Sequence, residues 1–323
     1  MSDREEKTGK NDNGKKNKGG KRNKIVAIEM IILVLLIMAA VAIFIQRDKS
    51  VKEAAKIHNQ KAKKTEQTPQ AAQKENEIEE ETEGTEEETG DRDAAVPDRS
   101  NFAVQPGVSV GTTEQSDEKI VYLTLDDGPS DNTQAVLDIL DKYNVKATFF
   151  VTGEMPEYKD MIKAAYDKGH TIGMHTYSHD YAKVYASVDA YFQDLDQIGQ
   201  MVQEEIGYVP CFIRFPGGSS NTVSKKYTAG IMSTLVQEVQ NRGYQYYDWN
   251  GSSGDGSVRT TEELVAQATS FDSNNIILLC HDSHGKQTTV EALPQIIEHY
   301  QSLGYTFKAL DRDSFVAHHG VNN

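Results

Sequence analysis

Residues 118–323 alternate between short hydrophobic runs and longer amphipathic stretches. The runs are rich in β-branched and aromatic residues, which predicts strands at Ile120–Leu125, Ala147–Val151, Thr171–Met174, Cys211–Phe215, Tyr244–Trp249, Ile276–Cys280 and Thr306–Leu310. The stretches between them predict helices at Thr133–Tyr143, Tyr158–Lys168, Val188–Ile206, Lys226–Arg242, Thr261–Phe271 and Val290–Leu303. This alternation predicts an α/β fold with a parallel sheet of about seven strands. That many strands in about 200 residues favours a barrel, although periodicity alone does not separate a barrel from an open sheet.

The chain before residue 118 has a different pattern. Ile25–Ile45 is a run of 21 residues, apolar except for Glu29, and is long enough to cross a bilayer as a helix. The basic residues before it favour a cytoplasmic N-terminus. A signal-peptidase site at Ala40–Ala42 is the alternative, but the apolar run continues beyond it.

These features predict four parts of the chain. Residues 1–24 are a cytoplasmic basic tail, 25–45 a single-pass transmembrane anchor, 46–117 a disordered charged tether, and 118–317 an extracytoplasmic folded domain. We therefore expect the protein at the cell membrane, held there by its N-terminal helix.

The formal net charge of −15 is distributed unevenly. Residues 1–24 carry nine Lys/Arg and four Asp/Glu, whereas residues 75–93 carry eleven Asp/Glu and one Arg. This distribution argues against nucleic acid as the main partner, and we expect a monomer. The only cysteines, Cys211 and Cys280, lie in strand-like runs, where two buried free thiols are the simpler interpretation and a disulfide is the alternative.

Two adjacent carboxylates follow the first predicted strand. The sequence Thr-Leu-Asp-Asp-Gly-Pro-Ser at 124–130 places Asp126 and Asp127 where a buried strand meets a loop. Ligands bind at this rim in α/β folds, and neighbouring carboxylates are costly unless a cation or hydrogen bonds hold them. An isolated Asp-Asp-Gly is more often a helix-capping turn, so the other strand ends decide between the two interpretations.

Polar side chains also follow four further strands. They are His175 and His179, Arg214, Asp248 and Asp255, and His281 with Asp282. Because the C-terminal ends of parallel strands share one rim, we expect these groups to converge. The two histidines are four residues apart, which on a helical turn would place both imidazoles on one face. With a strand-end Asp they predict a metal site of two histidines and a carboxylate with an open coordination position.

Four segments, in this order, resemble the motifs of the polysaccharide deacetylase family, which is carbohydrate esterase family four and is also called NodB-like. They are Thr124–Pro129, His175–His179, Arg214–Gly218 and Ile277–His281, and the resemblance covers about residues 118–312. The resemblance implies a deformed (β/α) barrel and a divalent metal, usually zinc. An Asp/His/His set also accepts cobalt or nickel.

The resemblance also implies roles for individual residues. The metal ligands are Asp127, His175 and His179, the catalytic base is Asp126, its partner is Arg214, and the catalytic acid is His281. An Asp orients the acid in this family. The distance in sequence from Trp249 favours Asp255, while Asp248-Trp249 is the literal match. The expected substrate-binding residues are Phe215, through a nearby backbone N–H, with Trp249 and Leu279.

These residue types indicate amide hydrolysis. Asp126 would take a proton from water, and His281 would protonate the departing amine. We expect metal-dependent removal of N-acetyl groups from a cell-wall glycan polymer, first of all peptidoglycan N-acetylglucosamine, with release of acetate. The alternatives are deacetylation of N-acetylmuramic acid residues, chitin-like chains or acetylated xylan, or an inactive glycan-binding module. An inactive module would lack a ligand, the base or the acid, and this sequence has all of them.

Overall fold

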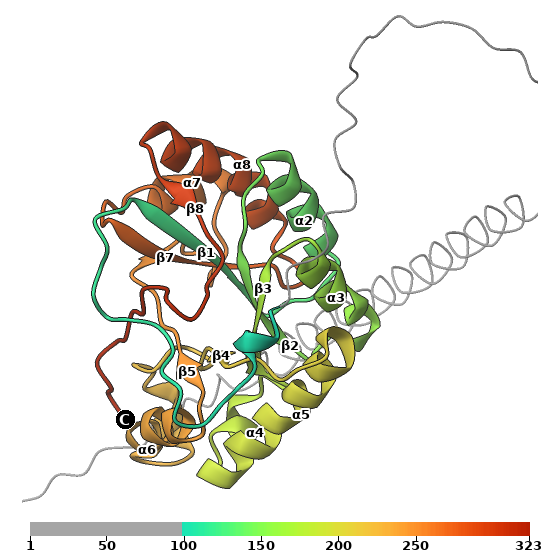
Figure 1. Cartoon of the computed structure of the whole chain (residues 1–323), viewed down its shortest axis with the longest axis vertical. Coiled ribbons are helices and arrows are strands. Elements are labelled where there is room, and N and C mark those ends of the chain that lie inside the picture. The colour runs from blue at the N-terminus through green and yellow to red at the C-terminus, as the bar shows by residue number, and fades with distance from the viewer. Residues whose placement is uncertain (1–98) are drawn as a thin grey trace, which may run out of the picture. The chain divides into compact units, whose positions relative to one another are not determined.

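The computed structural model describes residues 99–323 (Figure 1). Its strands are β1 Ile120–Asp126, β2 Thr148–Thr152, β3 Thr171–Thr176, β4 Phe212–Ile213, β5 Gln245–Tyr246, β6 Gly251–Ser252, β7 Asn275–His281 and β8 Thr306–Phe307. Its α-helices are α2 Thr133–Lys142, α3 Asp160–Asp167, α4 Tyr181–Val184, α5 Val188–Ile206, α6 Ile231–Asn241, α7 Thr261–Ala268 and α8 Gln287–Ser302. Three 3₁₀ turns are η1 Ser100–Phe102, η2 Pro156–Tyr158 and η3 Val223–Lys226.

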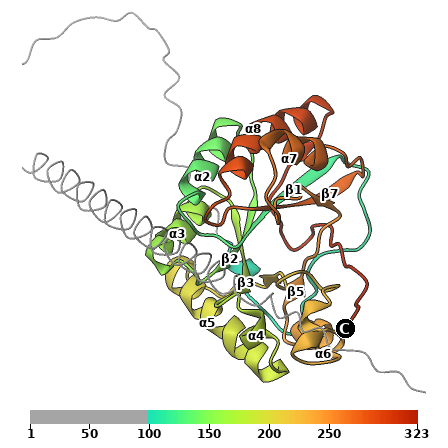
Figure 2. The ribbon, with the colours of Figure 1, turned by 180° about the vertical axis from the view of Figure 1, so that it is seen from behind.

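All of the strand pairs within the described residues are parallel. The order along the sheet is β5-β4-β3-β2-β1-β7-β6, and β8 pairs with the start of β1. The outer strands β5 and β6 are joined by residues 247–250 but are not paired with each other in the described part of the chain. The predicted α/β fold with a parallel sheet is confirmed, and the sheet is a curled half-barrel whose hydrogen-bonded ladder does not close. Figures 1 and 2 show the helices around the outside of this sheet.

The sequence prediction missed β6 and α4 and misplaced several helix starts, that of α6 the furthest. β6 lies in a Gly/Ser-rich stretch, and α4 has only four residues, so neither gives a periodic signal. The helix expected from Lys226 begins at Ile231, because η3 ends first and Gly230 adopts a left-handed φ of 77°.

Successive residues of β1 enter two different hydrophobic clusters. Val121, Leu123 and Leu125 pack under the helices, whereas Ile120 and Tyr122 pack inside the curl of the sheet. All seven β1 residues are buried, which fits a parallel strand covered on both faces. Each fully buried Leu contributes about 1.5–3 kcal/mol to folding. By the same alternation, Thr124 and Asp126 face the inside of the curl.

Strand β7 repeats this alternation beside β1. Ile276, Leu278 and Cys280 belong to the helix-side cluster, while Ile277 belongs to the inner one. Leu279 and His281 therefore share the inner face. The register pairs Asp126 with His281, so the C-terminal ends of β1 and β7 lie side by side in the sheet.

The described residues before Glu118, where the folded domain was expected to begin, pack against the rest of the domain. The Phe102 ring packs edge-on against Phe212 at 5.2 Å, and the Phe102 carbonyl accepts the Cys211 N–H. Arg99 donates to the carbonyls of Tyr166 and His170. Residues 99–117 are thus part of the domain. The expected tail and anchor, and residues 46–98 of the expected tether, lie outside the described residues.

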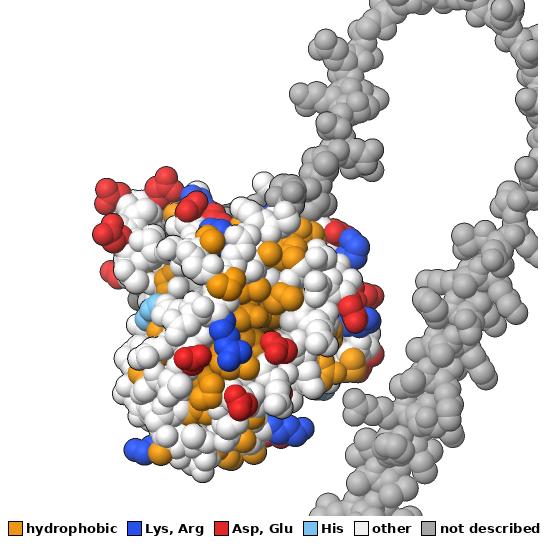
Figure 3. All heavy atoms as spheres, turned by 60° about the horizontal axis from the view of Figure 1, so that its bottom comes forward, with side chains coloured by type: hydrophobic (Ala, Val, Ile, Leu, Met, Phe, Trp, Pro, Cys, Tyr) orange, Lys and Arg blue, Asp and Glu red, His pale blue; other side chains and the backbone are white. Residues whose placement is uncertain are grey.

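Neither cysteine forms a disulfide: Cys211 and Cys280 are buried free thiols, as expected. No helix between residues 99 and 323 combines the length and apolarity that a membrane crossing requires. On the face shown in Figure 3, hydrophobic side chains form a band with basic and acidic side chains around it.

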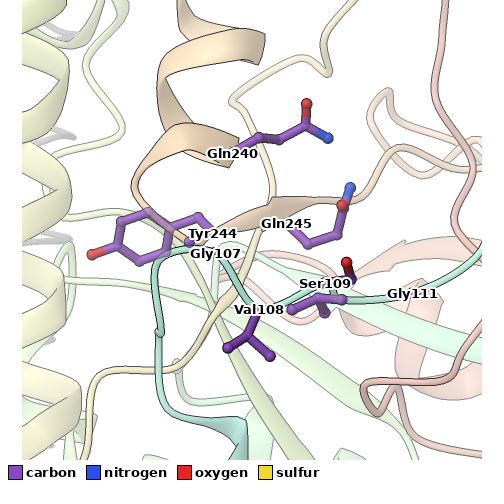
Figure 4. Close-up of a pocket in the computed structure, with 9 residues that line it drawn as sticks. Gly107, Val108, Ser109, Gly111, Gln240, Tyr244 and Gln245 are labelled. Atoms are coloured by element: carbon purple, nitrogen blue, oxygen red, sulfur yellow. The ribbon is translucent and has the colours of Figure 1, made fainter.

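A cavity of about 400 Å³ lies between residues 107–111, the end of α6 and strand β5 (Figure 4). Gln240, Gln245 and Ser109 contribute polar groups to its lining. It lies where β5 begins, whereas the expected catalytic groups follow the ends of the strands. This cavity is therefore separate from the site described next.

Candidate active site

Asp126 and Arg214 form a buried ion pair at the end of β1. The guanidinium Nη1 donates to Asp126 Oδ1 at 2.7 Å, and both side chains are at most 3% exposed. Arg214 also donates to Thr124 Oγ1 and to the carbonyls of Tyr247 and Asp248. A buried charge is tolerated when its donors are satisfied in this way.

The Arg214 guanidinium also packs against the Phe150 ring. Its Cζ lies 4.3 Å from the centre of the Phe150 ring, a favourable cation–π position. Gly173 leaves room for that ring, because a Cβ there would lie 2.6 Å from Phe150 Cδ1. Sequence reasoning identified Arg214 but missed this supporting pair, which belongs to the buried strands β2 and β3.

Asp127, His175 and His179 bring one ligand atom each to within 4.8 Å of one another. Asp127 Oδ1 lies 3.4 Å from Nε2 of both histidines. It is buried and has no hydrogen-bond partner among the described residues. His175 Nδ1 donates to the Arg214 carbonyl at 2.7 Å, which leaves its Nε2 free as a ligand. These residues therefore fit a divalent metal ion.

The backbone at two of these residues is unusual. Asp127 has a φ of 68° and His179 a φ of 47°, a region that non-glycine residues seldom occupy. Such outliers concentrate at functional sites. The helical turn expected from the histidine spacing is wrong, because His175 lies on β3 and His179 in the loop before α4.

Asp194 of α5 holds the loop between the two histidines. Its Oδ1 accepts the Tyr177 and Ser178 N–H groups at 2.6 and 3.1 Å, and its Oδ2 accepts the Ser178 hydroxyl at 2.6 Å. Sequence reasoning missed this residue. The available signal was a carboxylate on the buried face of an amphipathic helix.

Asp282 supports the loop that carries Asp127. Its Oδ2 accepts the Thr133 hydroxyl at 2.6 Å, and burial raises its pKa to about 7. A Cβ on Gly128 would lie 2.3 Å from Asp282 Oδ1, so only glycine fits there. The sequence indicated Asp282 at the rim but not this contact.

His281 is oriented by Asp255. Its Nδ1 lies 2.7 Å from Asp255 Oδ1, and its backbone N–H donates to Asp255 Oδ2 at 2.8 Å. Burial alone would lower the pKa of His281, but the Asp255 carboxylate outweighs burial and raises it to about 9. Its Nε2 faces the metal-binding set, 4.0 Å from Asp127 Oδ2. Of the two carboxylates left open by the sequence, Asp255 contacts His281, whereas Asp248 contacts Ser219 and His319.

The three expected substrate-binding residues differ in position. The Phe215 side chain is 1% exposed and packs against Tyr191 and Tyr246 in the helix-side core, so only its backbone is available to a ligand. Leu279 lies on the inner face two residues before His281. Trp249 is half-buried, with its ring centre 5.7 Å from Arg214 Cζ.

Several known proteins are similar to this chain in sequence and in fold. The family model described as polysaccharide deacetylase matches residues 113–236. A putative polysaccharide deacetylase of Bacillus subtilis is 30% identical over 217 residues, which cover 64% of this chain and 72% of the relative. The chain belongs to the polysaccharide deacetylase family.

Two further relatives of this deacetylase have more specific names. A peptidoglycan-N-acetylglucosamine deacetylase of Bacillus cereus is 29% identical over 226 residues, covering 65% of this chain and 78% of the relative. The solved catalytic domain of a peptidoglycan N-acetylglucosamine deacetylase from Eubacterium rectale is 47% identical, with a TM-score of 0.63. That match covers 65% of this chain and 97% of the solved domain. The family expected from the motifs is therefore confirmed, and with it the assignment as a carbohydrate esterase, a hydrolase.

Proposed function

We propose that this deacetylase removes N-acetyl groups from a cell-wall glycan in a metal-dependent hydrolysis, with peptidoglycan N-acetylglucosamine as its substrate. One observation carries the proposal. Asp127, His175 and His179 form a ligand set on the same rim as two oriented pairs, Asp126 with Arg214 and His281 with Asp255. This constellation contains the ligands, base and acid that amide hydrolysis requires.

Asp127, His175 and His179 would hold the metal, and zinc is the first candidate because it favours nitrogen and carboxylate ligands, with cobalt or nickel as alternatives. When bound, a divalent ion polarises an amide carbonyl and increases the acidity of water. The protein fixes the ligands beforehand, through the Arg214 carbonyl at His175 and through Asp194 at the loop before His179.

Asp126 acts as the general base. The Arg214 guanidinium at 2.7 Å holds the carboxylate in place at the end of β1, where it accepts the proton of the attacking water. A bond then forms between the water oxygen and the acetyl carbon. We assign stabilisation of the carbonyl oxygen in this step to a backbone N–H near Phe215.

His281 acts as the general acid. Its pKa of about 9 keeps the imidazole protonated at neutral pH, and Asp255 directs Nδ1–H away from the substrate. Nε2–H is thus available to the amine nitrogen as the carbon–nitrogen bond breaks. Acetate and a free amine on the sugar are the products.

The proposed substrate rests on the site and on the relatives together. The Bacillus cereus and Eubacterium rectale proteins are named for peptidoglycan N-acetylglucosamine. Trp249 and Leu279 at the rim offer apolar surface for a sugar ring and an acetyl methyl group. An inactive binding module is disfavoured because the ligand set, base and acid are all in place.

We also propose that residues 25–45 anchor the protein in the cell membrane with the catalytic domain outside. The 21-residue apolar run and the basic residues before it support this proposal. Such an anchor would place the enzyme beside the wall polymer.

The test is acetate release by the purified protein from peptidoglycan, N-acetylglucosamine oligomers and acetylated xylan. We expect peptidoglycan or its oligomers to be preferred, chelator treatment to abolish release, and zinc to restore it. Preference for xylan would overturn the proposed substrate. Release that is unaffected after the metal has been removed would overturn the proposed mechanism.

A further inference from the structure

Asp248 is a buried carboxylate that the proposed mechanism does not use. Its Oδ1 accepts the Ser219 N–H at 2.8 Å, and its Oδ2 accepts the Ser219 hydroxyl at 2.5 Å and the His319 N–H at 2.7 Å. The side chain is 1% exposed, and these donors satisfy its charge. Asp248 thereby ties the loop that follows Arg214 to the end of the described chain.

Residues 317–323, here called the C-terminal strap, lie along this loop. The Ala317 carbonyl accepts the Asp248 N–H at 3.0 Å, and the Asn322 amide donates to the Ser220 carbonyl at 3.2 Å. Asn323 then reaches Ser224 and the first turn of α6 at Ser233. The strap is therefore fixed at both of its ends.

His319 is the residue of the strap that holds Trp249. Its Nε2 lies 2.6 Å from the Trp249 carbonyl, which can only accept, so Nε2 carries the proton. Nδ1 then accepts from the Ser220 hydroxyl at 3.2 Å. The imidazole also meets the indole edge-on, with ring centres 4.8 Å apart. His319 thus restrains both the backbone and the ring of Trp249.

The indole also lies near two groups of the candidate active site, and the Trp249 side chain remains partly exposed. Gly218, with a φ of 77°, lies against it so closely that a Cβ there would be 3.0 Å from indole Cη2. Arg214, the partner of the catalytic base, lies 5.7 Å from the indole centre. The ring therefore lies between the strap and the group that orients Asp126.

We propose that His319 is a positioning residue for substrate binding, which fixes the Trp249 indole as a rigid surface for one sugar ring of the glycan. An aromatic ring held in place before binding loses little conformational entropy when a sugar stacks on it, so affinity is higher. This role rests on the proposed function, because it assumes that a glycan occupies the rim. It concerns affinity and not the chemical step, since Asp126 and His281 are held by other groups.

Substitution of His319 tests this role, because Trp249 is the single tryptophan of the chain and reports its own surroundings by fluorescence. For His319→Ala we expect KM for N-acetylglucosamine oligomers to rise about five- to tenfold, with kcat within about twofold of wild type. We also expect the Trp249 emission to shift to longer wavelength and its response to oligomers to weaken. His319→Gln, whose amide can donate to the Trp249 carbonyl, should restore KM to within about twofold.

His299→Ala on α8 serves as the control and should leave KM and emission unchanged. A lower Tm with unchanged KM in His319→Ala would show a merely structural role and overturn the proposal. If that variant does not fold, Ser220→Ala, which removes the hydroxyl at His319 Nδ1, must raise KM in the same direction or the proposal is wrong. Absence of acetate release by the wild type would instead refute the proposed function. The role of His319 would then be judged by the fluorescence response to oligomers alone.

Discussion

Asp126 and Asp127 are neighbours in sequence but have different partners. Asp126 ends β1 on its inner face and meets Arg214, whereas the left-handed backbone of Asp127 turns its carboxylate towards two histidines. A strand end followed by a tight turn thus separates two identical side chains into the proposed base and a proposed metal ligand. Gly128, which follows them, lies so close to Asp282 that a Cβ would clash with its carboxylate.

The pKa of His281 gives a prediction at this scale. Its Asp255 partner raises the pKa to about 9, so removal of that charge makes the imidazolium lose its proton at lower pH. We expect Asp255→Asn to move the alkaline limb of the kcat/KM profile down by about one pH unit or more. Asp248→Asn, a buried carboxylate without contact to His281, should leave the limb in place. If the alkaline limb of the kcat/KM profile does not move in Asp255→Asn, His281 is excluded as the acid.

Buried His170 gives a prediction about stability. Burial lowers its pKa from 6.5 to about 3, so between these values the unfolded chain binds a proton that the folded protein does not. Its stabilising contribution is therefore complete above pH 6.5 and decreases as the pH falls towards 3. From pH 7 to pH 5 the free energy of unfolding should fall by about 2 kcal/mol more in the wild type than in His170→Asn.

Urea unfolding of both proteins at the two pH values measures this difference. Asn can still accept the Ala147 N–H that His170 Nδ1 accepts at 3.2 Å, so the variant tests protonation more than lost contacts. Equal pH dependence in the two proteins would show that His170 titrates normally in the folded state.

At the scale of elements, the N-terminal segment 99–117 behaves as part of the domain. Phe102 packs on Phe212, and Val110 joins the cluster inside the curl of the sheet. A chain that begins at Glu118 loses this apolar burial. We expect its Tm to be lower by about 5 °C or more than that of a chain that begins at Arg99, because the lost burial amounts to about 2–3 kcal/mol. Equal melting temperatures would show that the segment only rests on the surface.

Long periodic elements could be predicted from the sequence, and short ones could not. The expected bounds of α5, Val188–Ile206, match the structure because an amphipathic helix of this length ends at a glycine with positive φ. Two-residue strands such as β6 carry no period and are defined only by pairing with β7. The packing of 99–117 was missed because a polar stretch with isolated apolar residues has the composition of a linker.

The site was more predictable than the fold around it, since its residues follow strand ends and parallel strands share a rim. Asp126, Asp127, His175, Arg214 and His281 could be placed there in advance. The distance in sequence from Trp249 favoured Asp255 over Asp248, and Asp255 is the carboxylate that contacts His281. Asp194 and Asp282 were missed as supports because their partners are remote in sequence.

At the scale of the whole molecule, the proposed anchor gives a prediction about location. The full chain should sediment with membranes and remain there after an alkaline wash, because 21 mostly apolar residues cross a bilayer stably. A chain that begins at Arg99 should remain in the supernatant. Recovery of the full chain in the soluble fraction, with residues 25–45 intact, would contradict the anchor.

The most direct measurement compares acetate release from peptidoglycan by the wild type and by Asp126→Asn at equal zinc content. Asp126 lies beside the proposed metal ligands without being one of them, so the variant should bind zinc normally and lose activity by about 10²–10⁴-fold. This result would establish a hydrolase with Asp126 as its base. Undiminished release by zinc-loaded Asp126→Asn would contradict the account.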